Sequence, residues 1–89
     1  MAYAERIIGN AYVYEKCEQG FYRVINEDGD CNFLRLPQNY GVGDKGVLVY
    51  YSDGVSYGLT KFQKDDTVAI DFNKMKESYL KRWNTELKF

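Results

Sequence analysis

The chain has 89 residues, of which 45% are hydrophobic and 17% aromatic, with a net charge of −1 and no histidine. That length predicts a single domain over residues 1–89, and the apolar share excludes a disordered chain. The charge balance counts against a protein that coats nucleic acid nonspecifically, because such proteins usually carry a basic excess.

The N-terminal part of the chain predicts three strands. Apolar residues recur from about Ile7 to Glu15, which indicates a first strand. A turn at residues 17–20 separates it from a second strand, Phe21–Asn26. Asp28-Gly29 is a strong hairpin signal, since glycine accepts positive φ at little cost, and it predicts a return strand over Cys31–Leu36.

The middle of the chain predicts a second hairpin. Pro37–Asp44 reads as a loop, and the nearly continuous apolar run Gly46–Tyr51 predicts a central strand covered on both faces. Ser52-Asp53-Gly54 is a turn signal that leads to a return strand over Tyr57–Phe62. After a polar turn, a last short strand is expected over Thr67–Phe72.

The tail changes to helical spacing. A helix is predicted from about Asn73 to Leu87, with Asp71 or Asn73 as the cap. One apolar stripe runs along it, and we expect this stripe, anchored by Trp83, to plug one end of a barrel; its members are Phe72, Met75, Tyr79, Leu80, Trp83 and Leu87.

Together these elements predict a mainly β fold, a small barrel of five to six strands with a C-terminal α-helix. Residues 1–71 would form the barrel and residues 72–89 the helix packed on it. The run Gly43-Asp44-Lys45-Gly46, followed by an apolar strand and a hairpin, looks like the pattern of small SH3-like barrels. An OB-like barrel, with a different order of connections, is the alternative.

The residue inventory argues against catalysis. Without histidine there is no Ser-His or Cys-His pair, and the serines fall in a turn and on the helix. Neighbouring acids such as Asp65 and Asp66 lie in turns, where solvated surface explains them. Cys17 and Cys31 are expected to be free thiols, too few for a zinc site. We therefore expect no enzyme activity, no catalytic residue, no metal and no cofactor.

The N-terminus carries charge and no apolar core of a signal peptide, and no run approaches the length of a membrane span. The expected location is cytoplasmic, without a membrane partner.

The function expected first is a non-enzymatic, protein-binding module. Tyrosine gives large contact area at low entropic cost, and the acidic body, with a net charge of −4 over residues 1–71, suits a basic partner. The candidate contact residues are Tyr22, Tyr40, Tyr50, Tyr51 and Tyr57. By analogy of size and composition, the chain resembles accessory proteins of phages and mobile elements that block or scaffold larger assemblies.

Two alternatives remain open at this point. The first is binding of single-stranded nucleic acid through Phe21, Phe33 and Tyr57 beside Arg23, Arg35 and Lys61. The net charge disfavours it, and Phe21 and Phe33 are expected in the core instead. The predicted helix adds a small basic face that would contact phosphate, made by Lys74, Lys76, Lys81 and Arg82. The second alternative is a self-associating structural subunit, and the sequence leaves the oligomeric state open.

Overall fold

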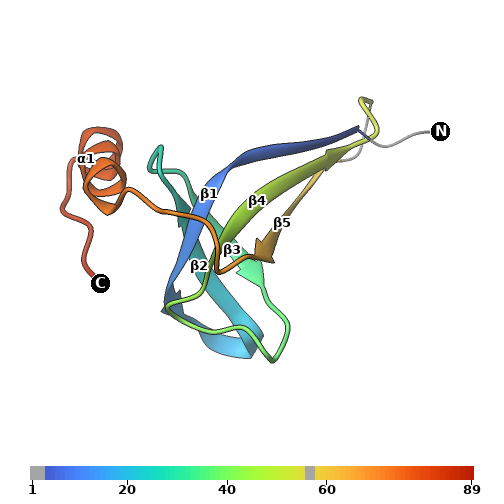
Figure 1. Cartoon of the computed structure of the whole chain (residues 1–89), viewed down its shortest axis with the longest axis horizontal. Coiled ribbons are helices and arrows are strands. Elements are labelled where there is room, and N and C mark those ends of the chain that lie inside the picture. Colours follow the sequence, from blue (N-terminus) through green and yellow to red (C-terminus); the bar gives the residue numbers. More distant parts are fainter. Residues whose placement is uncertain (1–3, 56–57) are drawn as a thin grey trace.

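The computed structural model describes residues 4–55 and 58–89 and contains five strands and one α-helix (Figure 1). The strands are β1 (Ala4–Lys16), β2 (Phe21–Asn26), β3 (Cys31–Arg35), β4 (Lys45–Ser52) and β5 (Gly58–Lys64). A short 3-10 turn, η1 (Glu18–Gly20), joins β1 to β2, and the helix is α1 (Phe72–Trp83). The prediction of a mainly β chain with a C-terminal helix is confirmed.

All five strands form one antiparallel sheet in the order β3-β2-β1-β4-β5, which curls into a half-barrel (Figure 1). In the described part of the chain, β3 and β5 have no strand partner on their outer sides. The prediction of a small barrel of five to six strands is confirmed in part: the sheet has five strands, but it is a half-barrel, because its two edges do not pair with each other.

The predicted last strand, Thr67–Phe72, is also wrong, because local hydrogen bonds hold this segment in other conformations. The Asp65 carboxylate accepts from the backbone N–H of Thr67 at 2.9 Å and from its hydroxyl at 2.6 Å. Such local bonds favour a turn over a sheet ladder. Asp71 then caps the helix, since its carboxylate accepts from the Lys74 backbone N–H at 3.0 Å.

Strand β1 holds the sheet together because it pairs with both β2 and β4. Its register with β4 shifts between Ile7 and Gly9, and its register with β2 shifts between Val13 and Glu15. Gly9 has a φ of +139°, which an L side chain rarely adopts. These two irregularities bend and twist the long strand, which lets the sheet curl around the core.

The main core lies on the concave face of the sheet. Its buried members are Ala11, Val13, Val24, Leu36, Leu48 and Phe62. Side chains alternate between the two faces of a strand. In β4 both faces are covered, since Leu48 and its neighbour Val49 are both buried, and the prediction of a doubly covered central strand is confirmed.

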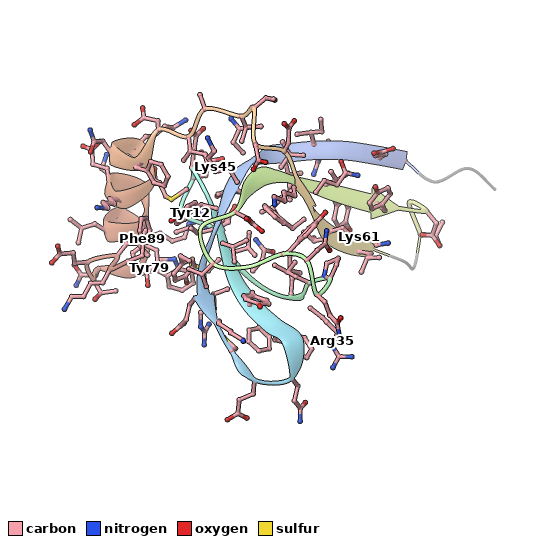
Figure 2. All side chains as sticks on the ribbon, turned by 60° about the horizontal axis from the view of Figure 1, so that its bottom comes forward. Tyr12, Arg35, Lys45, Lys61, Tyr79 and Phe89 are labelled. Carbon is pink, nitrogen blue, oxygen red and sulfur yellow. The ribbon has the colours of Figure 1, made fainter. Side chains whose placement is uncertain are left out.

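The helix packs on the opposite, outer face of the sheet. Met75 is fully buried there against Ile25, and Leu87 completes this second cluster. Figure 2 shows Tyr12, Tyr79 and Phe89 gathered where the helix meets the sheet. The prediction that the helix plugs the end of a barrel is wrong, because α1 packs on the outer face of the sheet, over residues of β1, β2 and β3.

The helix is shorter than predicted, although the predicted Asp71 cap is confirmed. It ends at Trp83 because Asn84 adopts the left-handed conformation, with φ of 53°. Leu80 and Trp83 are 50% and 52% exposed, so these two members of the predicted apolar stripe are only half-buried. Trp83 anchors the helix through its indole N–H, which donates to the carbonyl of Gly29 at 3.0 Å.

Both hairpin turns follow the predicted signals. Gly29 and Gly54 have φ values of +81° and +80°. Gly29 is also required for helix docking, because a Cβ there would lie 2.9 Å from the backbone of Ser78. In the second turn the Ser52 hydroxyl accepts from the backbone N–H of Gly54 at 2.9 Å.

Candidate functional site

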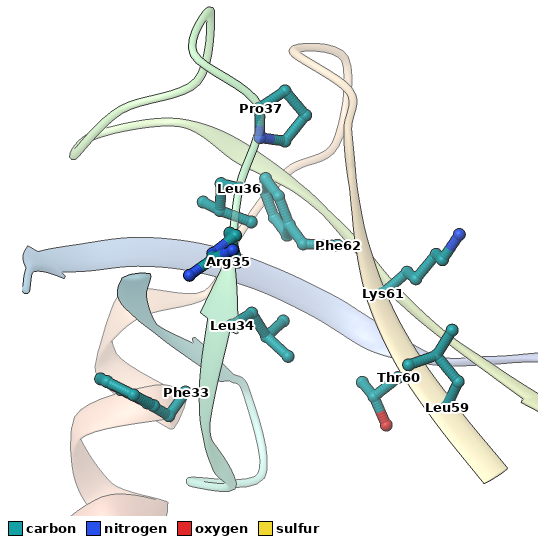
Figure 3. A pocket seen from close by; sticks show the side chains of 9 residues that line it. All are labelled: Phe33, Leu34, Arg35, Leu36, Pro37, Leu59, Thr60, Lys61 and Phe62. Carbon is teal, nitrogen blue, oxygen red and sulfur yellow. The ribbon is translucent and has the colours of Figure 1, made fainter. Parts of the chain in front are cut away.

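A groove of about 420 Å³ lies between the two edge strands of the half-barrel (Figure 3). We call it the seam groove, because it lies where a closed barrel would join β3 to β5. It is lined by Phe33, Leu34, Arg35, Leu36, Pro37, Leu59, Thr60, Lys61 and Phe62. Both open edges of the sheet contribute to it.

Alternation along the strands divides the lining residues into a floor and a rim. The floor consists of Leu34, Leu36, Thr60 and Phe62, which are buried or half-buried. In Figure 3, Leu34 and Phe62 point into the space between the strands, whereas Phe33 and Lys61 point away from it. The exposed rim consists of Phe33, Arg35, Leu59 and Lys61.

The hydrogen bonds of β3 show which of its backbone groups face the groove. Leu36, just beyond the strand, donates its N–H to the carbonyl of Gly20 at 3.1 Å. In an antiparallel ladder, residues that bond to the partner strand alternate with residues that do not. Since the register with β2 is regular, Phe33 and Arg35 direct their N–H and C=O groups to the open side.

The same argument applies to β5. Asp65, just beyond this strand, donates its N–H to the carbonyl of Lys45 at 2.8 Å. The register between β4 and β5 is regular, so Thr60 and Phe62 direct their backbone groups away from β4 and into the groove. An open strand edge of this kind is a template for pairing with another extended chain.

The rim on the β3 side is a stack of side chains on the outer face of β2 and β3. The rings of Phe21 and Phe33 lie 4.7 Å apart with an interplanar angle of 3°. The Arg35 guanidinium lies 4.9 Å from the centroid of Phe21, and that of Arg23 lies 5.6 Å from the centroid of Phe33. The expectation that Phe33 belongs to the core is wrong, since it is 53% exposed, and the half-buried Phe21 lies outside both core clusters.

The groove is positively charged although the chain as a whole is acidic. Its only charged lining residues are Arg35 and Lys61. Arg23 is paired with Glu15 at 2.8 Å and Lys64 with Asp44 at 3.6 Å. Within the described ranges, Arg35 and Lys61 form no ion pair, and each lies over an aromatic ring on the neighbouring strand.

The predicted tyrosine surface is spread over several places. Tyr22 and Tyr40 are half-buried and pack against the main core. Tyr50 is half-buried on β4, and its hydroxyl lies against Gly58 of β5. Tyr51, on the other face of β4, accepts from the side-chain amide of Gln63 at 3.3 Å. Tyr57 lies outside the described residues.

The predicted basic face of the helix is partly occupied within the chain. Arg82 is paired with Asp30 at 2.8 Å, and the Lys76 ammonium lies 5.3 Å from the ring centroid of Phe89. Lys74 and Lys81 are exposed. The helix and the groove lie at different ends of the molecule, as the positions of Phe89 and Arg35 in Figure 2 show.

One of the two cysteines, Cys31, accepts a hydrogen bond from a tyrosine. Both are free and half-buried. The hydroxyl of Tyr14 donates to the Cys31 sulfur at 3.6 Å. Burial and this hydrogen bond raise the pKa of Tyr14 well above its usual range, so the phenol stays neutral at ordinary pH. In residues 4–55 and 58–89, no three His, Cys, Asp or Glu side chains gather into a metal site.

No helix among the described residues is both long enough and apolar enough to cross a membrane. Comparisons of the chain with protein-family models, with curated proteins and with solved structures found no match. The function therefore has to be inferred from the geometry of the seam groove and its surroundings.

Proposed function

We propose that the protein is a non-enzymatic, protein-binding module that takes an extended peptide segment into the seam groove. The observation that carries the proposal is that two strand edges, which have no strand partner in the described part of the chain, flank one apolar groove. Adding a strand to an exposed edge is a recurring mode of peptide recognition, in which main-chain hydrogen bonds give affinity and side-chain pockets give specificity.

The strand order supports an OB-like rather than an SH3-like arrangement. An OB-fold is a five-stranded, partly open Greek-key barrel. Here β1 pairs with both β2 and β4, and the chain crosses from one edge of the sheet, β3, to β4 on the other side of β1. The seam groove is then the place where such a barrel stays open.

Several contacts would contribute to binding. The outward backbone groups of Phe33, Arg35, Thr60 and Phe62 offer hydrogen bonds, each worth about 0.5–1.5 kcal/mol net. The floor offers apolar surface for alternate side chains of the segment. Exposed aromatic and arginine side chains at the rim are the residue types enriched at protein interfaces.

Single-stranded nucleic acid is the second candidate, and the exposed Phe21–Phe33 pair beside two arginines is the observation that favours it. Bases bind such sites by stacking on open ring faces. In this structure the two rings stack on each other and an arginine lies over each of them, so a base would have to compete with these contacts. The peptide proposal needs no such rearrangement.

Self-association is the remaining alternative, because an open edge can also pair with a second copy of the same chain. Light scattering of the purified protein separates the two cases. A clean monomer keeps the groove available to a different partner, whereas a closed oligomer that dissociates when the groove is altered would replace the peptide proposal.

The proposal can be tested by removing one backbone donor. Proline at an outward-facing edge position removes an N–H that points into the groove and leaves the ladder to the neighbouring strand intact. Thr60→Pro is such a variant, and Thr60→Val is its matched control, because it keeps the N–H and a β-branched side chain and only exchanges the hydroxyl for a methyl group. Arg35→Pro with Arg35→Ala repeats the comparison on the other edge.

We expect a displayed library of random peptides to yield binders that recognise the wild type and Thr60→Val and fail to bind Thr60→Pro. Thermal unfolding establishes that each variant is folded, and the Arg35 pair serves if Thr60→Pro is not. Peptides that bind the proline variants as well as their controls would contradict the proposal, as would a library that yields no binder.

A further inference from the structure

Resting on the proposed function, we infer that the segment bound in the seam groove is acidic, with apolar and carboxylate side chains at alternate positions. The inference names the chemistry of the partner. It is carried by three features of the groove: the common direction of its two edges, the division of its lining into floor and rim, and the unpaired cations on that rim.

The direction of the edges decides how a segment would lie. In the antiparallel order β3-β2-β1-β4-β5, the strands β3 and β5 are an even number of places apart. They therefore run the same way along the seam. One segment running in the opposite direction pairs antiparallel with both edges at once, and antiparallel pairing is the slightly more stable kind.

The alternation of a strand decides which side chains go where. In a segment aligned with both edges, every second side chain points down onto the floor, where Leu34 and Phe62 are the largest groups. The intervening side chains lie on the outer face, beside Arg35 and Lys61. The apolar floor therefore favours apolar side chains at the positions of the segment that point onto it.

Charge determines which side chains fit the positions on the outer face of the segment. Arg35 and Lys61 are on opposite rims, and the lining contains no acidic residue. The carboxylates of Glu15 and Asp44 form their ion pairs with other cations, Arg23 and Lys64. Opposite charges across strands stabilise a sheet, so carboxylates fit these positions best. The basic partner expected from the overall charge does not match the groove.

One end of the groove limits where the segment can pair. Pro37 follows β3 and carries no N–H, and the Tyr40 hydroxyl already occupies the outward N–H of Lys64. Pairing is therefore concentrated at Phe33 and Arg35 on one edge and at Thr60 and Phe62 on the other. A short segment is enough to fill it.

Synthetic peptides test the pattern directly. Four labelled peptides of about eight residues, an ordinary strand length, are compared by fluorescence anisotropy. One alternates Val and Glu, one Val and Ser, one Val and Lys, and one carries Val and Glu in two separate blocks. Single-stranded oligothymidylate is the fifth probe, which distinguishes a carboxylate partner from a phosphate backbone.

We expect the alternating Val and Glu peptide to bind about 10-fold or more tightly than the other three, with affinity falling as salt is added. The double variant Arg35→Glu with Lys61→Glu should reverse the preference toward the Val and Lys peptide. The matched control is Lys74→Glu with Lys81→Glu, which makes the same change of charge on the distant helix and should leave the order unchanged.

The possible failures are distinguishable. Equal binding of the Glu and Ser peptides would overturn the acidic preference and leave strand addition standing. Acidic peptides that bind Thr60→Pro normally would contradict strand addition. Tighter binding of oligothymidylate than of any peptide would overturn both, in favour of nucleic acid. If no peptide binds, the inferred pattern is wrong, and the library selection decides the proposed function separately.

Discussion

The hydroxyl of Tyr40 accepts a hydrogen bond from the backbone N–H of Lys64 at 3.4 Å, and so a loop side chain covers part of the open edge of β5. The ring of Tyr40 stands edge-on to Phe62, with centroids 5.9 Å apart. This contact places the loop after Pro37 at one end of the seam groove. Tyr40, a candidate contact residue in the sequence, shields the part of this edge at Lys64.

Tyr40→Phe should expose the Lys64 N–H while the ring still packs on Phe62. The lost hydrogen bond costs about 0.5–1.5 kcal/mol of unfolding free energy. Amide hydrogen exchange measured by NMR should speed up at Lys64 and change little elsewhere. Tyr22→Phe is the control, and equal exchange at Lys64 in wild type and Tyr40→Phe would contradict the assigned contact.

Met75 holds the helix to the outer face of the sheet. It is fully buried, whereas Leu80 on the same helix is half exposed. Met75→Ala should lower the unfolding free energy by about 2–5 kcal/mol, because it leaves a cavity between helix and sheet. Leu80→Ala should cost clearly less in the same denaturant titration. Similar losses for both variants would mean that the helix packs differently.

Asn26 organises the first hairpin from a buried position. Its side-chain oxygen accepts from the backbone N–H groups of Asp28 and Asp30, both at 3.0 Å. Asn26→Ala leaves both donors without that acceptor, and we expect a loss of about 1–3 kcal/mol in thermal or denaturant unfolding. Asn39→Ala, in an exposed loop, is the control and should change stability little. A neutral Asn26→Ala would contradict this role.

The raised pKa of Tyr14 predicts how the free energy of unfolding changes at alkaline pH. Its folded-state pKa is raised chiefly by burial, with added contributions from Cys31 and Tyr79. As pH rises, the unfolded chain loses the phenol proton first, near its ordinary pKa of about 10. The stability associated with neutral Tyr14 is therefore complete below about pH 10 and falls as pH rises further.

Tyr14→Phe has no phenol proton to lose, so its stability should fall less steeply than that of the wild type above about pH 10. Denaturant titrations at several alkaline pH values measure the difference between the two proteins. Parallel pH profiles of the two proteins would show that Tyr14 ionises as easily in the folded chain as in the unfolded chain, and would contradict its raised pKa.

Local features of this fold could be predicted from the sequence because local rules decide them. Gly29 and Gly54 mark the two turns, and Asp71 caps the helix. Each depends on backbone conformation or on side chains a few residues apart. The corresponding predictions are confirmed.

Nonlocal features could not be predicted in the same way. The apolar residue Phe33 was expected in the core, yet its stacking on Phe21 across two strands places it outside. The helical stripe extended to Leu87 in the sequence pattern, whereas Asn84 ends the helix and the tail folds back to bury Leu87. The seam groove exists because β3 and β5 do not pair, and the spacing of residues in the sequence does not determine the distance between these two strands.

Strand β1 connects the two halves of the sheet whose outer edges flank the seam groove. It is the only strand in the described sheet that joins the β2–β3 hairpin to the β4–β5 hairpin, and it bends at Gly9. We expect a change in that bend to alter how the two hairpins are oriented, and with it the width of the gap between β3 and β5. If the groove binds a segment as proposed, residues outside its lining would influence which segments fit, so a change of specificity need not begin in the groove itself.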